Sequence, residues 1–185
     1  MAGNNYLFQM DRRLYLIGFM GSGKSYTGRR LAEALRLPFL DLDEYLEERA
    51  GRRIARIFEE EGEAAFRALE AAVLRDTTRY EAAVIACGGG TPCYRDNMHW
   101  MNAHGVTIYL QTPVALLVDR LIDETAHRPL LQGLDREGLH RFVETKLKDR
   151  LAYYRQASVI VDQQGGGGDA IVQELIVHLD DITGH

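Results

Sequence analysis

Short runs of apolar residues alternate along this chain with longer segments whose apolar residues recur at helical spacing. The runs lie at 14–17, 38–42, 82–87, 106–110 and 159–162. Continuous apolar runs are typical of strands that are buried on both faces. Strands that alternate with helices indicate a parallel sheet covered by helices on both sides. The pattern therefore predicts a three-layer α/β/α fold with a five-stranded parallel sheet.

The segments between these runs are predicted to be helices. Apolar residues at helical spacing indicate helices at 24–35, 44–56 with a break at Gly51, 63–80, 96–104, 113–122, 138–156 and 170–179. Pro113 suits the first position of its helix, with Thr112 as the N-cap. The polar segment 123–137 and the glycine run 165–168 are predicted to be loops. At 185 residues we expect one domain, residues 1–185.

The first predicted strand leads directly into a glycine-rich loop. The string Gly18-Phe-Met-Gly-Ser-Gly-Lys24-Ser25 has the pattern G-x-x-x-x-G-K-[ST] between a strand and a helix. In this context backbone N–H groups and the helix N-terminus surround phosphates, the lysine contacts the outer phosphates, and the serine hydroxyl contacts Mg²⁺. The alternative is a glycine-rich turn that binds nothing. The loop predicts a nucleoside triphosphate with Mg²⁺, but it does not indicate the acceptor of the phosphate.

Further polar residues follow other predicted strands. Asp41 and Asp43 end the second strand, Gly88–Gly90 follow the third, and a polar segment around Arg128 lies further on. Because the carboxyl ends of parallel strands meet at one edge of the sheet, we expect these features to lie near the loop. In an extended strand Asp41 and Asp43 would face opposite sides. Alternatively, Asp41 ends the strand and Asp43 caps the next helix.

Composition narrows the possible partners. The chain is 46% apolar and 26% charged, with a net charge of −5, which is ordinary for a globular protein and argues against binding nucleic acid or an anionic membrane. Its two cysteines match no zinc pattern, and residues 1–10 lack the features of a signal peptide. We therefore expect a soluble cytoplasmic protein, with no nucleic-acid or membrane partner, that acts as a monomer.

Several strings together resemble the shikimate kinases, which are small ATP-dependent enzymes with the P-loop nucleoside-monophosphate kinase-like fold. The resemblance runs from about Leu14 to Asp162. It rests on GFMGSGKS, DLD, FEEEGEAAFRALE, GGG, HRPLL and DRLAYY, in the family's order. The family transfers the γ-phosphate of ATP to the 3-hydroxyl of shikimate, in the pathway to chorismate and aromatic amino acids. The resemblance thus implies this activity, with ATP and Mg²⁺ as cofactors and shikimate as substrate.

The resemblance also implies roles on the nucleotide side of the site. Lys24 would contact the β- and γ-phosphates, and Ser25 would bind Mg²⁺ while Asp41 held its water shell. Arg120 would lie along the adenine, and Arg128 would reach the phosphates from a lid at about 123–137. The implied ATP-binding set is Gly21, Ser22, Gly23, Lys24, Ser25, Tyr26, Arg120 and Arg128.

On the acceptor side, Arg67 and Arg150 would bind the shikimate carboxylate, while Gly89 and Gly90 would bring the backbone close to the same molecule. Asp43 would orient the hydroxyl that is phosphorylated. Since an exposed aspartate with a pKa of ~3.9 is a weak base, we expect orientation to be its main role, and base catalysis stays open. The implied catalytic residues are Lys24, Asp43 and Arg128.

Two alternatives stay open at this point. A related small-molecule kinase, such as a gluconate kinase, would share the phosphate loop, although the pair Arg67 and Arg150 with the glycine triplet argues against it. A shikimate-kinase-like module without catalysis would share the fold. The presence of Lys24, Ser25, Asp41 and Asp43 argues against this second alternative.

Overall fold

The protein is built on one parallel sheet. A computed structural model describes residues 12–125, 129–163 and 168–183. Within these residues the strands run in the order β2-β3-β1-β4-β5, and every neighbouring pair is parallel. The strands are β1 (Arg13–Ile17), β2 (Phe39–Asp41), β3 (Ala83–Ala86), β4 (Gly105–Gln111) and β5 (Val159–Asp162). The predicted five-stranded parallel sheet is confirmed.

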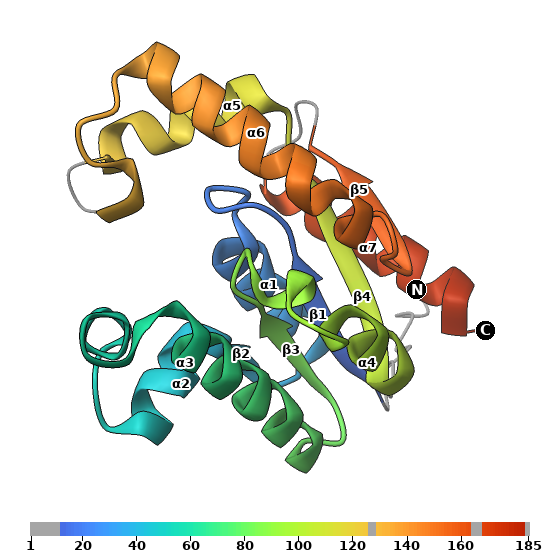
Figure 1. Ribbon diagram of the computed structural model, residues 1–185. Helices are drawn as coiled ribbons and strands as arrows, with labels where there is room; N and C mark the ends of the chain where they lie inside the picture. Colours follow the sequence, from blue (N-terminus) through green and yellow to red (C-terminus); the bar gives the residue numbers. More distant parts are fainter. Residues whose placement is uncertain (1–11, 126–128, 164–167, 184–185) are drawn as a thin grey trace.

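Helices cover both faces of the sheet (Figure 1). Those described are α1 (Lys24–Leu35), α2 (Leu42–Ala50), α3 (Ile54–Asp76), α4 (Asn97–His104), α5 (Val114–Leu121), α6 (Arg136–Tyr154) and α7 (Gly168–Thr183). Helices α1 and α7 pack on one face, and α2, α3 and α4 pack on the other. Helices α5 and α6 lie side by side beyond the carboxyl ends of the strands and share a third apolar cluster with Phe19. This places the α5–α6 pair next to the loop that follows β1.

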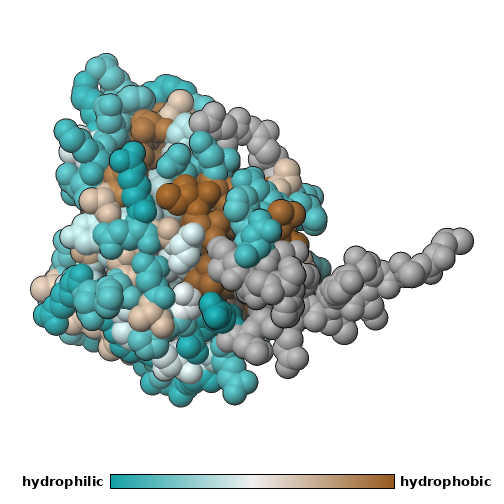
Figure 2. Space-filling view, turned by 90° about the vertical axis from the view of Figure 1, so that its right-hand side faces the viewer, coloured by the Kyte–Doolittle hydropathy of each residue, from teal (hydrophilic) through white to brown (hydrophobic). Residues whose placement is uncertain are grey.

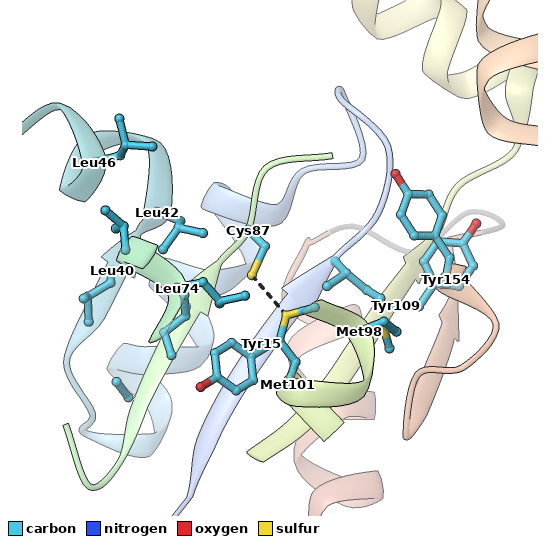
Figure 3. Packing of buried hydrophobic residues seen from close by; sticks show 14 of the residues in the cluster. Tyr15, Leu40, Leu42, Leu46, Leu74, Cys87, Met98, Met101, Tyr109 and Tyr154 are labelled. Carbon is cyan, nitrogen blue, oxygen red and sulfur yellow. Dashed lines mark hydrogen bonds between the residues drawn. The ribbon is translucent and has the colours of Figure 1, made fainter. Parts of the chain in front are cut away.

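Alternate side chains along the strands point to opposite faces of the sheet and pack into two separate apolar clusters. In β1, Leu14 and Leu16 join the cluster under α1 and α7, whereas Tyr15 and Ile17 join the cluster under α2, α3 and α4. All four are fully buried, which explains why the strands appear as continuous apolar runs. Figure 3 shows the second cluster, with the Sγ of Cys87 directed toward Met101 at 3.9 Å. The sheet is therefore a rigid platform for the loops at its edge.

The turn after β2 differs from its prediction. The predicted strand 38–42 is too long, because Asp41 is the N-cap of α2 and its side chain accepts a hydrogen bond from the N–H of Asp43. Asp43 consequently lies in the first turn of a helix and not in a strand, so strand alternation does not separate its side chain from that of Asp41. Gly51 ends α2 with a φ of 66°, as its predicted break requires.

Helix α3 is interrupted at Gly62, directly before residue 63, where the predicted helix starts, but it is already helical from Ile54. Gly62 has a φ of 81° and a ψ of 177° inside the helix, and regular helical geometry resumes after it. The second part, from residue 63, corresponds to the predicted helix 63–80, but it ends at Asp76 and continues as a short 3₁₀ turn. The part after Gly62 buries Phe66 and Glu70.

The segment around α5 needs two corrections. The N-cap of α5 is Pro113 and not Thr112, because the Thr112 hydroxyl donates to the backbone oxygen of Leu110 and to Gln163. Helix α6 begins at Arg136, capped by Asp135, so the end of the predicted polar loop 123–137 is helical. The rest of this loop includes short 3₁₀ turns at Ile122–Glu124 and Pro129–Leu131, and Arg128 lies outside the described residues.

The surface carries few large apolar side chains. Among the described residues the large apolar ones that are exposed are Tyr26, Phe58, Leu130, Ile160 and Val177. In the face shown in Figure 2, hydrophilic side chains predominate and hydrophobic ones gather in a central band. No helix within the described ranges has the length and apolar character that crossing a membrane requires.

Candidate functional site

The loops at the carboxyl ends of β1, β2 and β3 enclose a cavity of about 350 Å³. Three of the four polar features that the sequence places at strand ends meet here, as predicted; the fourth, around Arg128, lies outside the described residues. The lining residues are Met20, Gly21, Gly23, Lys24, Ser25, Tyr26, Asp41, Asp43, Ala86, Cys87, Gly88 and Gly89. Most of the candidate nucleotide and substrate residues therefore share one cavity.

The phosphate loop is folded to present its backbone toward this cavity. Gly21 and Gly23 have φ values of 78° and 84°, a region in which other residues are strained. The Nζ of Lys24 donates to the backbone oxygens of Gly18 and Phe19 at 3.0 and 2.9 Å, so the loop holds its own lysine. Helix α1 begins at Lys24, and its N-terminus adds partial positive charge where an anion would bind.

Two oxygen groups beside the loop suit a magnesium ion. The Ser25 hydroxyl donates to Oδ2 of Asp41 at 2.6 Å, and both residues line the cavity. Mg²⁺ is usually held by one or two protein oxygens, with water and phosphate oxygens completing its shell. No group of three or more His, Cys, Asp and Glu residues within the described ranges is placed to hold a metal. The serine–aspartate pair therefore fits Mg²⁺ bound together with a nucleotide.

Asp43 differs from an ordinary surface aspartate. Although solvent reaches it, surrounding protein atoms partly desolvate its carboxyl, and this raises its pKa from 3.8 to about 6. The negative charges of Asp41 and Glu70 raise the pKa further, whereas Lys24 and Arg67 lower it. The expectation of an ordinary pKa near 3.9 is therefore wrong, and the carboxyl is a stronger base than the sequence suggested.

Arg67 is held in place by a buried carboxylate. Its Nη1 donates to Oε2 of Glu70 at 3.0 Å, so these two residues, three positions apart, pair on one face of α3. Glu70 is 1% exposed, and its Oε1 accepts a hydrogen bond from the Thr91 hydroxyl at 2.6 Å. A Cβ on Gly90 would lie 2.6–2.7 Å from the guanidinium of Arg67. The glycine thus admits the arginine to the edge of the site.

Arg150 reaches the same place from α6. Its Nη1 is buried and has no hydrogen-bond partner among the described residues, and it would lie 3.0 Å from a Cβ on Gly89. Its guanidinium lies over the ring of Phe19, with 5.3 Å between Cζ and the ring centroid. The backbone oxygen of Gly89 accepts from the Tyr154 hydroxyl at 2.6 Å. Consecutive glycines therefore bring two guanidinium groups together.

Arg120 lies on the opposite side of the phosphate loop. It lines a second cavity of about 290 Å³ with Ser22, Gly23, Tyr26, Thr27, Gln163, Gly168 and Ile171. Gly23 and Tyr26 also line the first cavity, so the two are neighbours. The Nη1 of Arg120 donates to the backbone oxygen of Gly21 at 3.0 Å. Arg120 is thus hydrogen-bonded to the phosphate loop, beside the place where it is predicted to contact the adenine.

The chain matches known proteins over most of its length. Residues 20–180 match the family model "Shikimate kinase". This chain belongs to the shikimate kinase family. A shikimate kinase of Bacteroides fragilis is 43% identical over 148 residues, which cover 80% of this chain and 83% of the relative. Members of the family are ATP-dependent kinases that use Mg²⁺, and this chain is one of them.

Solved structures agree with this assignment. The crystal structure of a shikimate kinase from Bacteroides thetaiotaomicron has a TM-score of 0.85 and 37% identity, covering 91% of this chain and 98% of its own. A shikimate kinase from Acinetobacter baumannii in complex with shikimate also has a TM-score of 0.85, with 35% identity over 96% of this chain and 98% of its own. The expected P-loop kinase fold is confirmed.

Sequence reasoning missed three contributors to this shikimate kinase site. Thr91 and the bridging position of Glu70 went unnoticed, because nothing in the sequence shows that the residue after the glycine triplet meets α3. Gln163 also went unnoticed, although it binds both the phosphate loop and Arg120. Its place directly after β5 was an available signal, since polar residues at strand ends supply the rest of the site.

Proposed function

We propose that this protein transfers the γ-phosphate of ATP to the 3-hydroxyl of shikimate, giving ADP and shikimate 3-phosphate. The observation that carries the proposal is the approach of Arg67 and Arg150 to Gly90 and Gly89, beside the phosphate loop. Shikimate has one carboxylate and three hydroxyls on a small ring. Two guanidinium groups suit the carboxylate, and bare glycine backbone leaves room for the ring.

The donor half of the reaction is assigned to the phosphate loop. Lys24 and the N-terminus of α1 neutralise charge on the transferred phosphoryl group, which is the main task of a protein in phosphoryl transfer. Ser25 and Asp41 hold Mg²⁺, which when bound offsets the negative charge of the phosphate oxygens. We assign Gly21, Ser22, Gly23 and Tyr26 to the nucleotide as well, with Arg120 along the base.

The acceptor half is assigned to Asp43 and the two arginines. Arg150 supports this role through its buried Nη1, which has no partner among the described residues and is ready to donate to an anion. Glu70 fixes the other arginine, Arg67, by a hydrogen bond of 3.0 Å. The shikimate carboxylate lies between these guanidinium groups, so its ring hydroxyls extend toward Asp43.

Asp43 both orients the reacting hydroxyl and accepts its proton. With a pKa of about 6 the carboxyl is still ionised near neutral pH, yet it is more basic than an ordinary aspartate. The proton leaves the 3-hydroxyl as its oxygen bonds to the γ-phosphorus, and the bond between that phosphorus and the β–γ bridging oxygen breaks. The leaving electron pair stays on ADP.

The remaining assignments concern the chain as a whole. The segment 123–137, which carries Arg128, acts as a lid that excludes water from the transferred phosphoryl group. The chain functions as one domain over residues 1–185, as a cytoplasmic monomer without nucleic-acid or membrane partners. The reaction takes place at the carboxyl edge of the sheet, with helices α5 and α6 and the lid contributing arginines.

A substrate panel tests the proposal. ADP release is followed in a coupled assay with ATP and Mg²⁺, using shikimate, quinate and gluconate as acceptors. We expect turnover with shikimate well above that with the other two. Quinate keeps the carboxylate and lacks the ring double bond, and gluconate is an open chain, so the panel separates recognition of the carboxylate from recognition of the ring. Turnover with gluconate alone would replace the proposal with the related kinase reaction.

A further inference from the structure

Gln163 is a buried glutamine that connects the phosphate loop to Arg120. It follows β5 directly, and its N–H donates to the backbone oxygen of Gln111 at 2.8 Å, extending the pairing of β4 and β5. Its side chain is 3% exposed. Because the backbone is fixed by the sheet and the side chain is enclosed, the amide group has little freedom to turn.

Both ends of the Gln163 amide are occupied. Nε2 donates to the backbone oxygen of Ser22 at 2.9 Å, while Oε1 accepts from Nη1 of Arg120 at 3.1 Å and from the Thr112 hydroxyl at 3.3 Å. Both acceptor positions of Oε1 are therefore occupied, and one of the two N–H groups of Nε2 is bonded to the phosphate loop. Its contacts point to a role exerted through the loop and through Arg120.

The hydrogen bond to Ser22 sets the orientation of a peptide in the phosphate loop. In a planar trans peptide the C=O and the following N–H point in opposite directions. When Gln163 holds the C=O of Ser22, the N–H of Gly23 is directed to the other side of that peptide plane. Gly23 lines the phosphate cavity and has a φ of 84°, so its neighbouring peptide is otherwise free to rotate.

The hydrogen bond from Arg120 acts on the neighbouring carbonyl. Nη1 of Arg120 donates both to Oε1 of Gln163 and to the oxygen of Gly21. Arg120 is otherwise an exposed residue of α5, and a long exposed side chain loses considerable rotamer entropy when it is ordered. Gln163 fixes the guanidinium in advance, and the consecutive carbonyls of Gly21 and Ser22 are both satisfied from the same side.

We propose that Gln163 is a positioning residue for the nucleotide, which presets the phosphate loop and Arg120 for binding. The inference rests on the proposed use of ATP but not on the identity of the acceptor. It assigns to the first residue after β5 an indirect role in nucleotide affinity. The adjoining second cavity, which holds Arg120, Gln163 and Tyr26, is then the place where the remainder of the nucleotide meets the protein.

The test uses Gln163→Met, which keeps the length of the side chain and removes both hydrogen-bonding groups. MgADP binding to the full-length protein is measured by isothermal titration calorimetry without shikimate, and the KM values for ATP and shikimate are measured separately. We expect the Kd for MgADP and the KM for ATP to rise roughly tenfold, the effect of losing well-aligned buried hydrogen bonds. The KM for shikimate should change less than about twofold, because the amide does not contact that side.

Two variants serve as controls. Gln156→Met makes the same replacement at an exposed glutamine just after α6, where the side chain donates to the backbone oxygen of Ala152. Thr112→Val removes the 3.3 Å bond to Oε1 and leaves the bonds to Arg120 and Ser22. Both should bind MgADP like the parent protein. The thermal midpoint without nucleotide, measured for all variants, shows whether a loss of affinity reflects a loss of folding.

A double-mutant cycle separates positioning from general damage. Arg120→Met should weaken MgADP binding, and adding Gln163→Met should weaken it by less than the product of the separate effects, since both remove one connected arrangement. Equal MgADP affinities in the parent protein and Gln163→Met would overturn the inference. So would parallel increases in the KM values for ATP and shikimate. Neither result would alter the outcome of the shikimate assay, which tests the proposed function independently.

Discussion

The donor and acceptor halves of the site are built in different ways. On the donor side, Lys24 bonds to carbonyls five and six positions before it, and Ser25 bonds to Asp41, sixteen positions away. On the acceptor side, Arg67 and Arg150 come from different helices and meet at Gly89 and Gly90. The donor half is thus a local structure, whereas the acceptor half exists only when distant parts of the chain have packed.

Each half contains one buried polar atom that has no hydrogen-bond partner among the described residues. In the donor half it is Oγ of Ser22 in the phosphate loop, and in the acceptor half it is Nη1 of Arg150. The lysine of the donor half, by contrast, is hydrogen-bonded within its own loop. An unsatisfied buried polar group lowers stability. The two unsatisfied atoms therefore indicate that each half is arranged for a polar group that a ligand supplies.

The largest expected effect comes from breaking the donor half at Lys24. Lys24→Met removes the cation next to the transferred phosphoryl group, and we expect kcat to fall on the order of 10³-fold or more, as for the loss of a preorganised group that stabilises charge. The protein should stay folded, because the loop keeps its glycines and α1 keeps its packing. Steady-state kinetics and circular dichroism measure the two quantities.

Lys146→Met is the matched control for that change. Lys146 is an exposed residue of α6, and replacing it should leave kcat within about twofold, in keeping with the small effects of surface substitutions. If the Lys24 variant retained substantial activity, the phosphate loop would not act through its lysine. The division into a donor half and an acceptor half would then have to be redrawn.

The second expected effect breaks the acceptor half. Arg150→Ala should weaken shikimate binding by about 2–5 kcal/mol, the range found when a buried charged partner is truncated, and should leave the KM for ATP nearly unchanged. Arg141→Ala, on the same helix but in an exposed pair with Glu137, should have almost no effect. An Arg150 variant impaired only toward ATP would assign that arginine to the donor half.

The same contrast explains what the sequence predicts well. The sheet, the phosphate loop and its lysine and serine follow from local patterns, because the apolar runs and G-x-x-x-x-G-K-[ST] each span only a few residues. The N-cap of α2 is harder to predict: strand and helix meet at Asp41 without an intervening loop, so the hydrophobic pattern alone predicts a strand up to residue 42. Element ends are set by single hydrogen bonds that periodicity does not register.

The acceptor half was predictable only through the family resemblance. No local rule joins Arg67 to Gly90 or Arg150 to Gly89, since these contacts depend on how α3 and α6 pack at the edge of the sheet. The raised pKa of Asp43 likewise depends on partial burial and on Glu70, which is distant in sequence. Long-range packing and electrostatics are the properties that are hardest to predict from a single sequence.

A smaller effect is expected from a change that moves Arg67 without removing it. Gly90 has a φ of −92° and a ψ of −13°, which alanine adopts without strain. Its new Cβ would nevertheless lie within 2.7 Å of the Arg67 guanidinium, so the arginine must shift. We expect Gly90→Ala to raise the KM for shikimate roughly tenfold, a value typical of a misplaced charge-assisted contact.

The KM for ATP is the control measurement for Gly90→Ala. It should stay the same, because Gly90 lines neither of the two cavities beside the phosphate loop. An unchanged KM for shikimate would show that Arg67 tolerates the displacement and does not need its present position. Combining the change with Arg67→Ala should then add little, since the glycine acts only through the arginine.

The smallest expected effect is a change in stability at Asp43, which lies where the two halves meet. Because its pKa is raised from 3.8 to about 6, the folded protein binds this proton more tightly than the unfolded chain, and its contribution to stability falls as the pH rises from 3.8 to 6. At pH values above 6, Asp43→Asn should therefore have a slightly higher thermal midpoint than the parent protein, and below pH 4 the two midpoints should be equal. The variant should lose its activity.

Asp181→Asn, at an exposed position of α7, is the matched control. Thermal melts of all three proteins across this pH range measure the difference, and a stabilisation by Asn that grew toward low pH would contradict the raised pKa. Catalytic need, and not stability, then explains why a carboxyl occupies the boundary between donor and acceptor.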